Sequence, residues 1–184
     1  MQIAHFPRVK MAHLPTPLEP LDRLSDHLGG PRIWVKRDDC TGLATGGNKT
    51  RKLEFLVADA LEQQADTLIT AGGLQSNHVR QTAAAAAKLG LACDLVLQRN
   101  VDWPEASYQV AGNILLDRLM GATLHIKEKG SDREAEMVDL AARLKSEGRT
   151  AYIIPVGGSN ATGALGYANC ALELVNQEND LGVP

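Results

Sequence analysis

A lysine at the mouth of a glycine-rich loop is the residue whose setting most clearly favours chemistry. Lys49 follows Gly46, Gly47 and Asn48, and a helical pattern begins directly after it. Backbone N–H groups and the positive end of a helix both oppose an ammonium charge at such a position. The neutral amine that this setting favours is the form that makes Schiff bases with carbonyl compounds. The loop therefore predicts a lysine that bonds covalently to a carbonyl group.

The same helix start offers a place for a phosphate, because unpaired N–H groups and the helix dipole attract anions. Lys52 lies one helical turn after Lys49 and therefore on the same face of the helix. One amine can bond an aldehyde while the other lies near a phosphate, and an aldehyde that carries a phosphate describes pyridoxal phosphate. An ordinary exposed lysine near a helix start is the alternative, and the pattern alone does not decide between the two.

A second polar loop follows an apolar strand that ends in Gly72–Gly73. It carries Gln75, Ser76, Asn77 and His78, and Ser76 or Asn77 is placed to cap the next helix. Ligands of open α/β sheets collect beyond the carboxyl ends of the strands. We therefore expect an anion site here, with a simple N-cap as the alternative. His78 is the weakest member, since a lone histidine near a helix start is usually structural.

Two further clusters leave alternatives open. Residues 157–160 form a glycine-rich turn between a strand and a helix, which suits a phosphate cradle or a close helix–strand contact. Neither this turn nor the loop after Gly72–Gly73 has Walker A spacing, and a nicotinamide fingerprint is missing, which argues against a dehydrogenase. Residues 36–39 end a strand with two charges of each sign, and most such clusters are solvated ion pairs. Because they border the loop of residues 46–49, which we call the lysine loop, a supporting role for that loop is a further hypothesis.

The composition narrows the class of protein. The chain has 184 residues, of which 44% are apolar and 22% charged, which is a globular balance. A net charge of −3 without a basic run argues against a nucleic-acid partner. Cys40, Cys93 and Cys170 are far apart, so neither a disulfide scaffold nor a metal site is expected. The start lacks a signal peptide and no apolar run reaches membrane-spanning length, so a soluble cytoplasmic protein is predicted.

Strands and helices are expected to alternate along most of the chain. Proline-rich residues 15–20 are expected to run extended over the surface, and Ser131 with Glu134 predicts a capping box. Such alternation implies an α/β fold with a parallel sheet and helices on its faces. The expected strands are 33–37, 67–71, 93–98, 123–127 and 151–155. The expected helices are 50–63, 77–89, about 106–120, 131–148 and 164–178.

The motifs together resemble the pyridoxal-phosphate enzymes that include D-cysteine desulfhydrase, L-cysteate sulfo-lyase and 1-aminocyclopropane-1-carboxylate deaminase. The resemblance spans nearly the whole chain and is carried by residues 36–39, 46–54, 75–81 and 157–160. It implies the tryptophan-synthase β-like fold of fold type II, in which a small and a large α/β domain clasp the cofactor.

By that analogy residues 49–158 form the small domain, while residues 1–48 and 159–184 belong to the large one. Lys49 is then the Schiff-base lysine and the base that removes the substrate's Cα proton. Lys52 neighbours the phosphate, and Asn77 holds the 3′-oxygen of the pyridine. Ser76 lies near the reacting carbon as a second catalytic residue. The implied substrate-binding set is Gln75, Ser76, Asn77 and His78.

The implied reaction is β-elimination on a small sulfur-containing amino acid. D-cysteine would give pyruvate, sulfide and ammonia, and L-cysteate would give pyruvate, sulfite and ammonia. Residues 38–47 look closest to the sulfo-lyases, whereas the family in general favours D-cysteine; a deaminase ranks third. A homodimer is also implied. Family chains continue well beyond residue 184, so the chain is expected to be truncated at its C-terminus, or else to be an inactive binding module, with weak cofactor binding.

Overall fold

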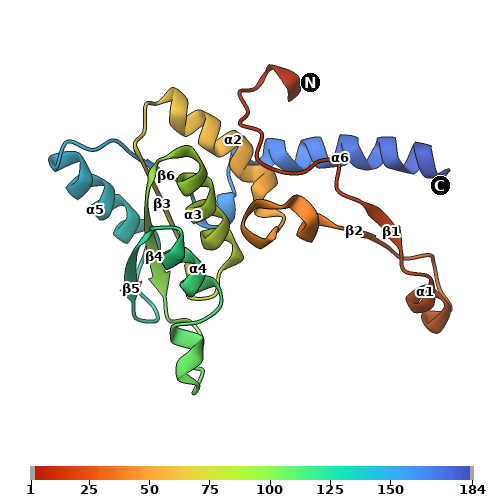
Figure 1. Ribbon diagram of the computed structural model, residues 1–184, viewed down its shortest axis with the longest axis horizontal. Coiled ribbons are helices and arrows are strands. Elements are labelled where there is room, and N and C mark those ends of the chain that lie inside the picture. Colours follow the sequence, from red (N-terminus) through yellow and green to blue (C-terminus); the bar gives the residue numbers. More distant parts are fainter. Residues whose placement is uncertain (1–2, 183–184) are drawn as a thin grey trace.

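The computed structural model describes residues 3–182, and a four-stranded parallel sheet is its centre (Figure 1). The order is β5-β4-β3-β6, and Thr67 of β3 pairs with Ala92 of β4 and Ala151 of β6. The two central strands are buried along almost their whole length, as strands covered on both faces must be. The predicted α/β fold class is confirmed. The strands are β3 (Thr67–Gly73), β4 (Ala92–Gln98), β5 (Thr123–Lys127) and β6 (Ala151–Ile153).

Helices cover both faces of this sheet. On one face α2 (Lys49–Glu62), α3 (Asn77–Leu89) and α4 (Asn113–Leu119) share a core with the sheet. On the other face α5 (Arg133–Ser146) packs Met137, Leu140 and Leu144 against β3 and β4. An alanine run fills the middle of α3, and its small side chains let that helix lie close to the strands. The carboxyl ends of β3 and β6 therefore open toward the starts of the next helices.

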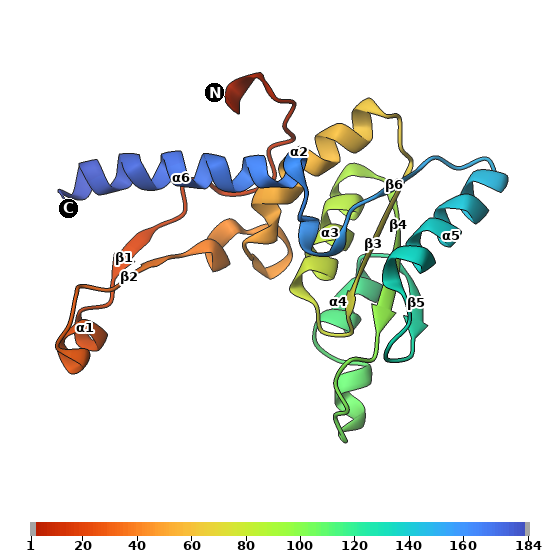
Figure 2. The same cartoon turned by 180° about the vertical axis from the view of Figure 1, so that it is seen from behind.

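A second part of the chain extends away from the sheet (Figures 1 and 2). It holds an antiparallel pair, β1 (Leu18–Pro20) with β2 (Trp34–Lys36), and α1 (Asp22–Leu28) between them. The long helix α6 (Ala161–Leu181) begins beside α2 and runs outward to the C-terminus. A Cβ on Gly166 would lie 2.3 Å from the carbonyl oxygen of Arg51, so only glycine lets α6 approach α2 this closely. The domain division at residues 48 and 158 stays a prediction.

Most predicted elements lie where the pattern put them, but four expectations were wrong in part. The helix expected at 106–120 is a 3₁₀ turn (η4, Ala106–Gln109) followed by α4, because Gly112 takes a positive φ of 63° between them. The expected capping box fails, since Asp132 and not Ser131 caps α5 by accepting from the N–H of Glu134. The extended residues 15–20 include Thr16, which is buried and not on the surface.

The last difference concerns two helices. The helix α1 was not predicted, and α6 starts three residues earlier than expected. Its start is fixed by Asn160, whose side chain accepts from the N–H of Gly163 at 2.8 Å. Further short 3₁₀ helices complete the fold: η1 (Ile3–His5), η2 (Asp38–Thr41), η3 (Leu43–Thr45) and η5 (Val156–Gly158). Within residues 3–182 no helix combines the length and apolar character needed to cross a bilayer.

Candidate active site

The two predicted lysines face the glycine-rich turn between β6 and α6. Lys49 is the first residue of α2, and a Cβ placed on Gly157 would lie 3.9 Å from the Lys49 Cε. The ammonium of Lys52 donates to the Gly157 carbonyl at 3.1 Å and to the hydroxyl of Ser159 at 3.0 Å. The structure thus brings the lysine loop and the 157–160 turn together.

The charges around Lys49 and Lys52 favour the binding of an anion. Burial and the neighbouring ammonium of Lys49 lower the pKa of Lys52. Burial, with Lys49 and Lys52 nearby, also lowers the pKa of His78 to about 4, so its ring is neutral at pH 7. Within the part of the chain that the structure describes, no carboxylate lies within ion-pair distance of either lysine. Two amines without a counter-ion fit a bound phosphate.

The loop that leads into Lys49 can be built only with glycine. A Cβ on Gly46 would lie 1.7 Å from the carbonyl oxygen of Asp39, and Gly46 has a φ of 75°. The Gly47 N–H donates to the hydroxyl of buried Thr41 at 2.8 Å, and that hydroxyl donates to the Gly47 carbonyl at 2.8 Å. The backbone is therefore clamped where the chain turns into α2, which fixes the direction of the Lys49 side chain.

The loop after β3 brings the second predicted group to the same end of the sheet. Ser76 caps α3, since its side chain accepts from the N–H of Val79 at 3.3 Å, which confirms the predicted cap. A Cβ on Gly72 would lie 2.7 Å from Val79, so the strand needs glycine to approach the helix. Asn77 is exposed, and its side-chain amide makes no hydrogen bond within residues 3–182. That amide is available to a ligand.

Gln75 and His78 have side chains that the protein itself engages. The Gln75 amide donates to the carbonyls of Tyr108 and Ala111, and its oxygen accepts from the Asn113 N–H at 2.8 Å. The ring of His78 is buried, with Nε2 2.9 Å from the Thr70 hydroxyl, while Nδ1 has no protein partner. These contacts fix the conformation of the loop after β3. The substrate-binding roles of both residues stay predictions.

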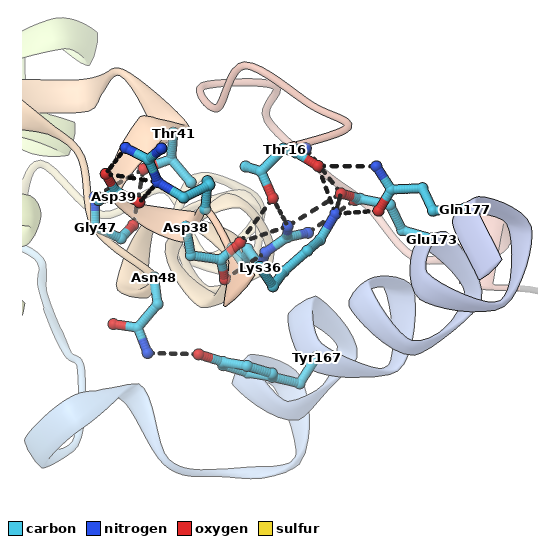
Figure 3. Close-up of polar contacts among 12 residues, drawn as sticks. Thr16, Lys36, Asp38, Asp39, Thr41, Gly47, Asn48, Tyr167, Glu173 and Gln177 are labelled. Atoms are coloured by element: carbon cyan, nitrogen blue, oxygen red, sulfur yellow. Dashed lines mark hydrogen bonds and ion pairs between the residues drawn. The ribbon is translucent and has the colours of Figure 1, made fainter. Parts of the chain in front are cut away.

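A part-buried ion network lies beside the lysine loop (Figure 3). The Arg51 guanidinium pairs with Asp38 at 2.7 Å and with Glu173 of α6 at 2.9 Å, and it donates to Thr16. Lys36 also pairs with Glu173. Of the two interpretations that the sequence left open for residues 36–39, solvated ion pairs describe Arg37 and Asp39, whose hydrogen bonds to each other are exposed. They do not describe Lys36 and Asp38, which join the network around Arg51.

One contact of the site had no local signal in the sequence. Asn48 donates from its side-chain amide to the hydroxyl of Tyr167, on α6 (Figure 3). The Lys52 ammonium lies 5.8 Å from the centre of the same ring, within cation–π range. The two residues of the hydrogen bond are 119 positions apart in the chain. Only the packing of α6 against α2 could reveal that Tyr167 borders the lysines.

The fold and the site define an α/β protein in which Lys49 and Lys52 face a glycine-rich turn at the end of a parallel sheet, and the comparisons give the family. The chain belongs to the family described as "Pyridoxal-phosphate dependent enzyme", whose profile matches residues 9–184. It is 55% identical over 176 residues to D-cysteine desulfhydrase of Serratia proteamaculans, covering 96% of this chain and 53% of that protein. The Salmonella typhi protein of the same name is 53% identical, with 95% and 53% covered. The chain spans about half the length of these curated relatives.

Solved structures agree on the fold. A structure described as an ACC deaminase homologue matches with a TM-score of 0.85 and 41% identity, covering 95% of this chain and 52% of that one. Apo diaminopropionate ammonia lyase of Escherichia coli matches with a TM-score of 0.69, covering 94% and 50%. At 19% identity that second likeness concerns the fold alone. The predicted fold type II architecture and family are confirmed.

Proposed function

We propose that the protein catalyses pyridoxal-phosphate-dependent β-elimination on a sulfur-containing amino acid, with D-cysteine as the preferred substrate. D-cysteine and water would yield pyruvate, sulfide and ammonia. The observation that carries the proposal is the pair Lys49 and Lys52, which face a glycine turn without a carboxylate partner among the described residues. The similarity to proteins named D-cysteine desulfhydrase supports the choice of substrate.

The residues present fit the cofactor. In this proposal Lys49 bonds the aldehyde, and Lys52 with the 157–160 turn holds the phosphate. The exposed side-chain amide of Asn77 donates to the 3′-oxygen of the pyridine, which is next to the aldehyde. When bound, the cofactor supplies the electron sink that stabilises a negative charge at the substrate's Cα. The chain supplies position and proton transfer.

Proton transfer is the task of the Lys49 amine when it is not bonded to the cofactor. That amine then takes the proton from Cα, for which it must be uncharged. Ser76, whose hydroxyl lies at the start of α3, is placed near the reacting carbon in this proposal. The N–H groups at the same helix start receive the substrate carboxylate. Gln75 and His78 complete the predicted substrate-binding set by shaping this loop.

Two other substrates of the same class are alternatives. L-cysteate, which would release sulfite, is the second candidate, because residues 38–47 resemble the sulfo-lyases. The cyclopropane amino acid of the deaminases is the third. A binding module that holds the cofactor without turnover is the alternative of another class. We also propose a cytoplasmic homodimer, for which the support is the family resemblance; light scattering would test the assembly.

The substrate choice is tested by release of ammonia from D-cysteine, L-cysteate and 1-aminocyclopropane-1-carboxylate in parallel. Sulfide and sulfite are measured in the same reactions, and Lys49→Ala serves as the blank. We expect the highest rate with D-cysteine, accompanied by sulfide. A higher rate with either other compound would replace the proposed substrate. Cofactor binding without any release would favour the binding module.

A further inference from the structure

The side chain of Gln81 lies buried between the starts of the two helices that carry the site. Its amide nitrogen donates to the carbonyl of Asn77 at 2.9 Å. Its amide oxygen accepts from both the N–H and the hydroxyl of Thr50, each at 2.9 Å. Gln81 is 0% exposed, and so is Thr50. One amide thus joins the residue after Lys49 to the backbone of Asn77.

The Gln81 side chain, which belongs to α3, acts as a cap for the start of α2. The first N–H groups of an α-helix have no partner within the helix. Asn48 occupies the N-cap position of α2 but makes no capping hydrogen bond, because its side chain reaches Tyr167 instead. The oxygen of Gln81 accepts from Thr50 in its place. Donors at Thr50 and an acceptor at Asn77 together determine which end of the amide faces which helix.

The packing around this amide leaves little room for the helix start to shift. A Cβ on Gly47 would lie 2.4 Å from the amide nitrogen of Gln81. On its other side Gly47 is held by the Thr41 hydroxyl through two hydrogen bonds. The chain entering Lys49 is therefore confined between Thr41 and Gln81. A change at Gln81 is expected to loosen the start of α2 relative to α3.

We propose that Gln81 is a positioning residue that sets the spacing between the Lys49 amine and the Asn77 amide. The inference rests on the proposed function, in which these two groups meet the aldehyde and the neighbouring ring oxygen of pyridoxal phosphate. Those two oxygen-bearing positions are adjacent on one rigid ring, so the side chains that meet them must keep one spacing. Gln81 itself stays behind both residues, buried from the cofactor.

Three variants test this role. Gln81→Leu removes the contacts to both helices. Gln81→Glu keeps acceptors for Thr50 but turns an acceptor toward the Asn77 carbonyl until the introduced carboxyl is protonated. Burial raises the pKa of such a carboxyl, so lowering the pH restores the donor. Gln98→Leu is the matched control, because Gln98 is also buried, at 5% exposure, but donates to Ser131 away from the lysines.

Two readouts are independent of turnover. The first is the rate at which added pyridoxal phosphate becomes covalently attached to Lys49, trapped with borohydride and followed by mass spectrometry. The second is amide hydrogen exchange over residues 49–52 in the cofactor-free protein. We expect Gln81→Leu to slow attachment about tenfold, as loss of a buried hydrogen bond would, and to speed exchange there. Gln98→Leu should change neither. Gln81→Glu, measured as a ratio to the wild type at each pH, should recover as the pH falls.

The outcomes separate the two proposals. Equal attachment rates in Gln81→Leu and Gln98→Leu, or a Gln81→Glu ratio that does not change with pH, would overturn the role of Gln81 while leaving the function intact. Absence of attachment at Lys49 in the wild type would remove the proposed function and this inference with it. Should Gln81→Leu fail to fold, the pH dependence of Gln81→Glu decides alone.

Discussion

Two sets of cations lie on opposite faces of the first turns of α2, and the protein treats them differently. Arg51 pairs with Asp38 and with Glu173 of α6, which neutralise its charge, and its side chain is 1% exposed. Lys49 and Lys52 face the glycine turn, where Lys52 donates to a carbonyl and a hydroxyl oxygen, and neither lysine pairs with a carboxylate among the described residues.

The difference separates a structural charge from a functional one. Burial alone would lower the pKa of Arg51, but the hydrogen bonds that it donates to Glu173 and Asp38 raise that pKa, so the guanidinium stays charged. Nothing comparable supports Lys52, whose pKa is lowered by burial and by Lys49. A cation that its own protein neutralises holds elements together. Cations left without a partner at a helix start are available to an anionic ligand.

The largest effect is expected from Lys49→Ala. Loss of the amine removes both the covalent attachment and the base, so the rate of ammonia release should fall by at least about 10²–10⁴-fold. The visible absorbance of the bound cofactor should disappear with it. Denaturation should show little change, because Lys49 forms no ion pair with any residue that the structure describes. Retention of either the activity or the colour would contradict the assignment of Lys49.

The opposite pattern is expected from Arg51→Met. This change leaves Asp38 and Glu173 partly unpaired in a buried setting, so the free energy of unfolding should fall by about 3 kcal/mol. The matched control is Arg37→Met, because Arg37 pairs with Glu19 and Asp39 near the surface. There the loss should be much smaller, because exposed ion pairs are screened by water. Equal losses in chemical denaturation of the two variants would mean that the network is no more than a surface feature.

A smaller effect on the ligand side is expected from Lys52→Met. Removing one charged hydrogen bond to a phosphate should weaken binding of pyridoxal phosphate by about 10–100-fold. Lys88→Met, an exposed lysine at the far end of α3, is the control and should bind normally. Fluorescence titration gives both affinities. If the two variants bind equally well, Lys52 does not hold the phosphate.

The smallest effect concerns pH. Burial would raise the pKa of Glu173, but hydrogen bonds from Arg51 and Lys36 outweigh it and lower the pKa to about 2 from a usual 4.5. The stability that Glu173 contributes is therefore complete above pH 4.5 and lost as the pH falls through about 2. Glu173→Gln should flatten the decline of unfolding free energy in that window. An unchanged slope in acid denaturation would show that Glu173 is not the group that titrates.

Local patterns predicted the parts of this protein that local chemistry determines. Apolar periodicity located the four strands of the parallel sheet and most helices, and glycine pairs marked the loops at Lys49 and at residues 157–160. The break in the helix at Gly112 was missed, because glycine tolerates both helical and left-handed backbone and the sequence does not say which it takes. The cap at Asp132 was missed because Ser131 beside it is an equally good capping residue.

The sequence could not predict contacts between residues that lie far apart in the chain. Arg51 resembles any helical arginine until η2 and α6 bring Asp38 and Glu173 to it, the second from 122 residues away. Tyr167 and Gln81 were missed as parts of the site for the same reason, since each depends on how two helices pack. Exposure was also unpredictable from residue type alone, as Thr16 and His78 are polar and yet buried.

The central claim is that the Lys49 amine is the group that bonds the cofactor aldehyde. Incubation of the protein with pyridoxal phosphate, reduction with borohydride and peptide mapping test it most directly. We predict a single phosphopyridoxyl group, carried by Lys49. The same group on Lys52 or on another lysine, or its absence from the folded protein, would contradict the account.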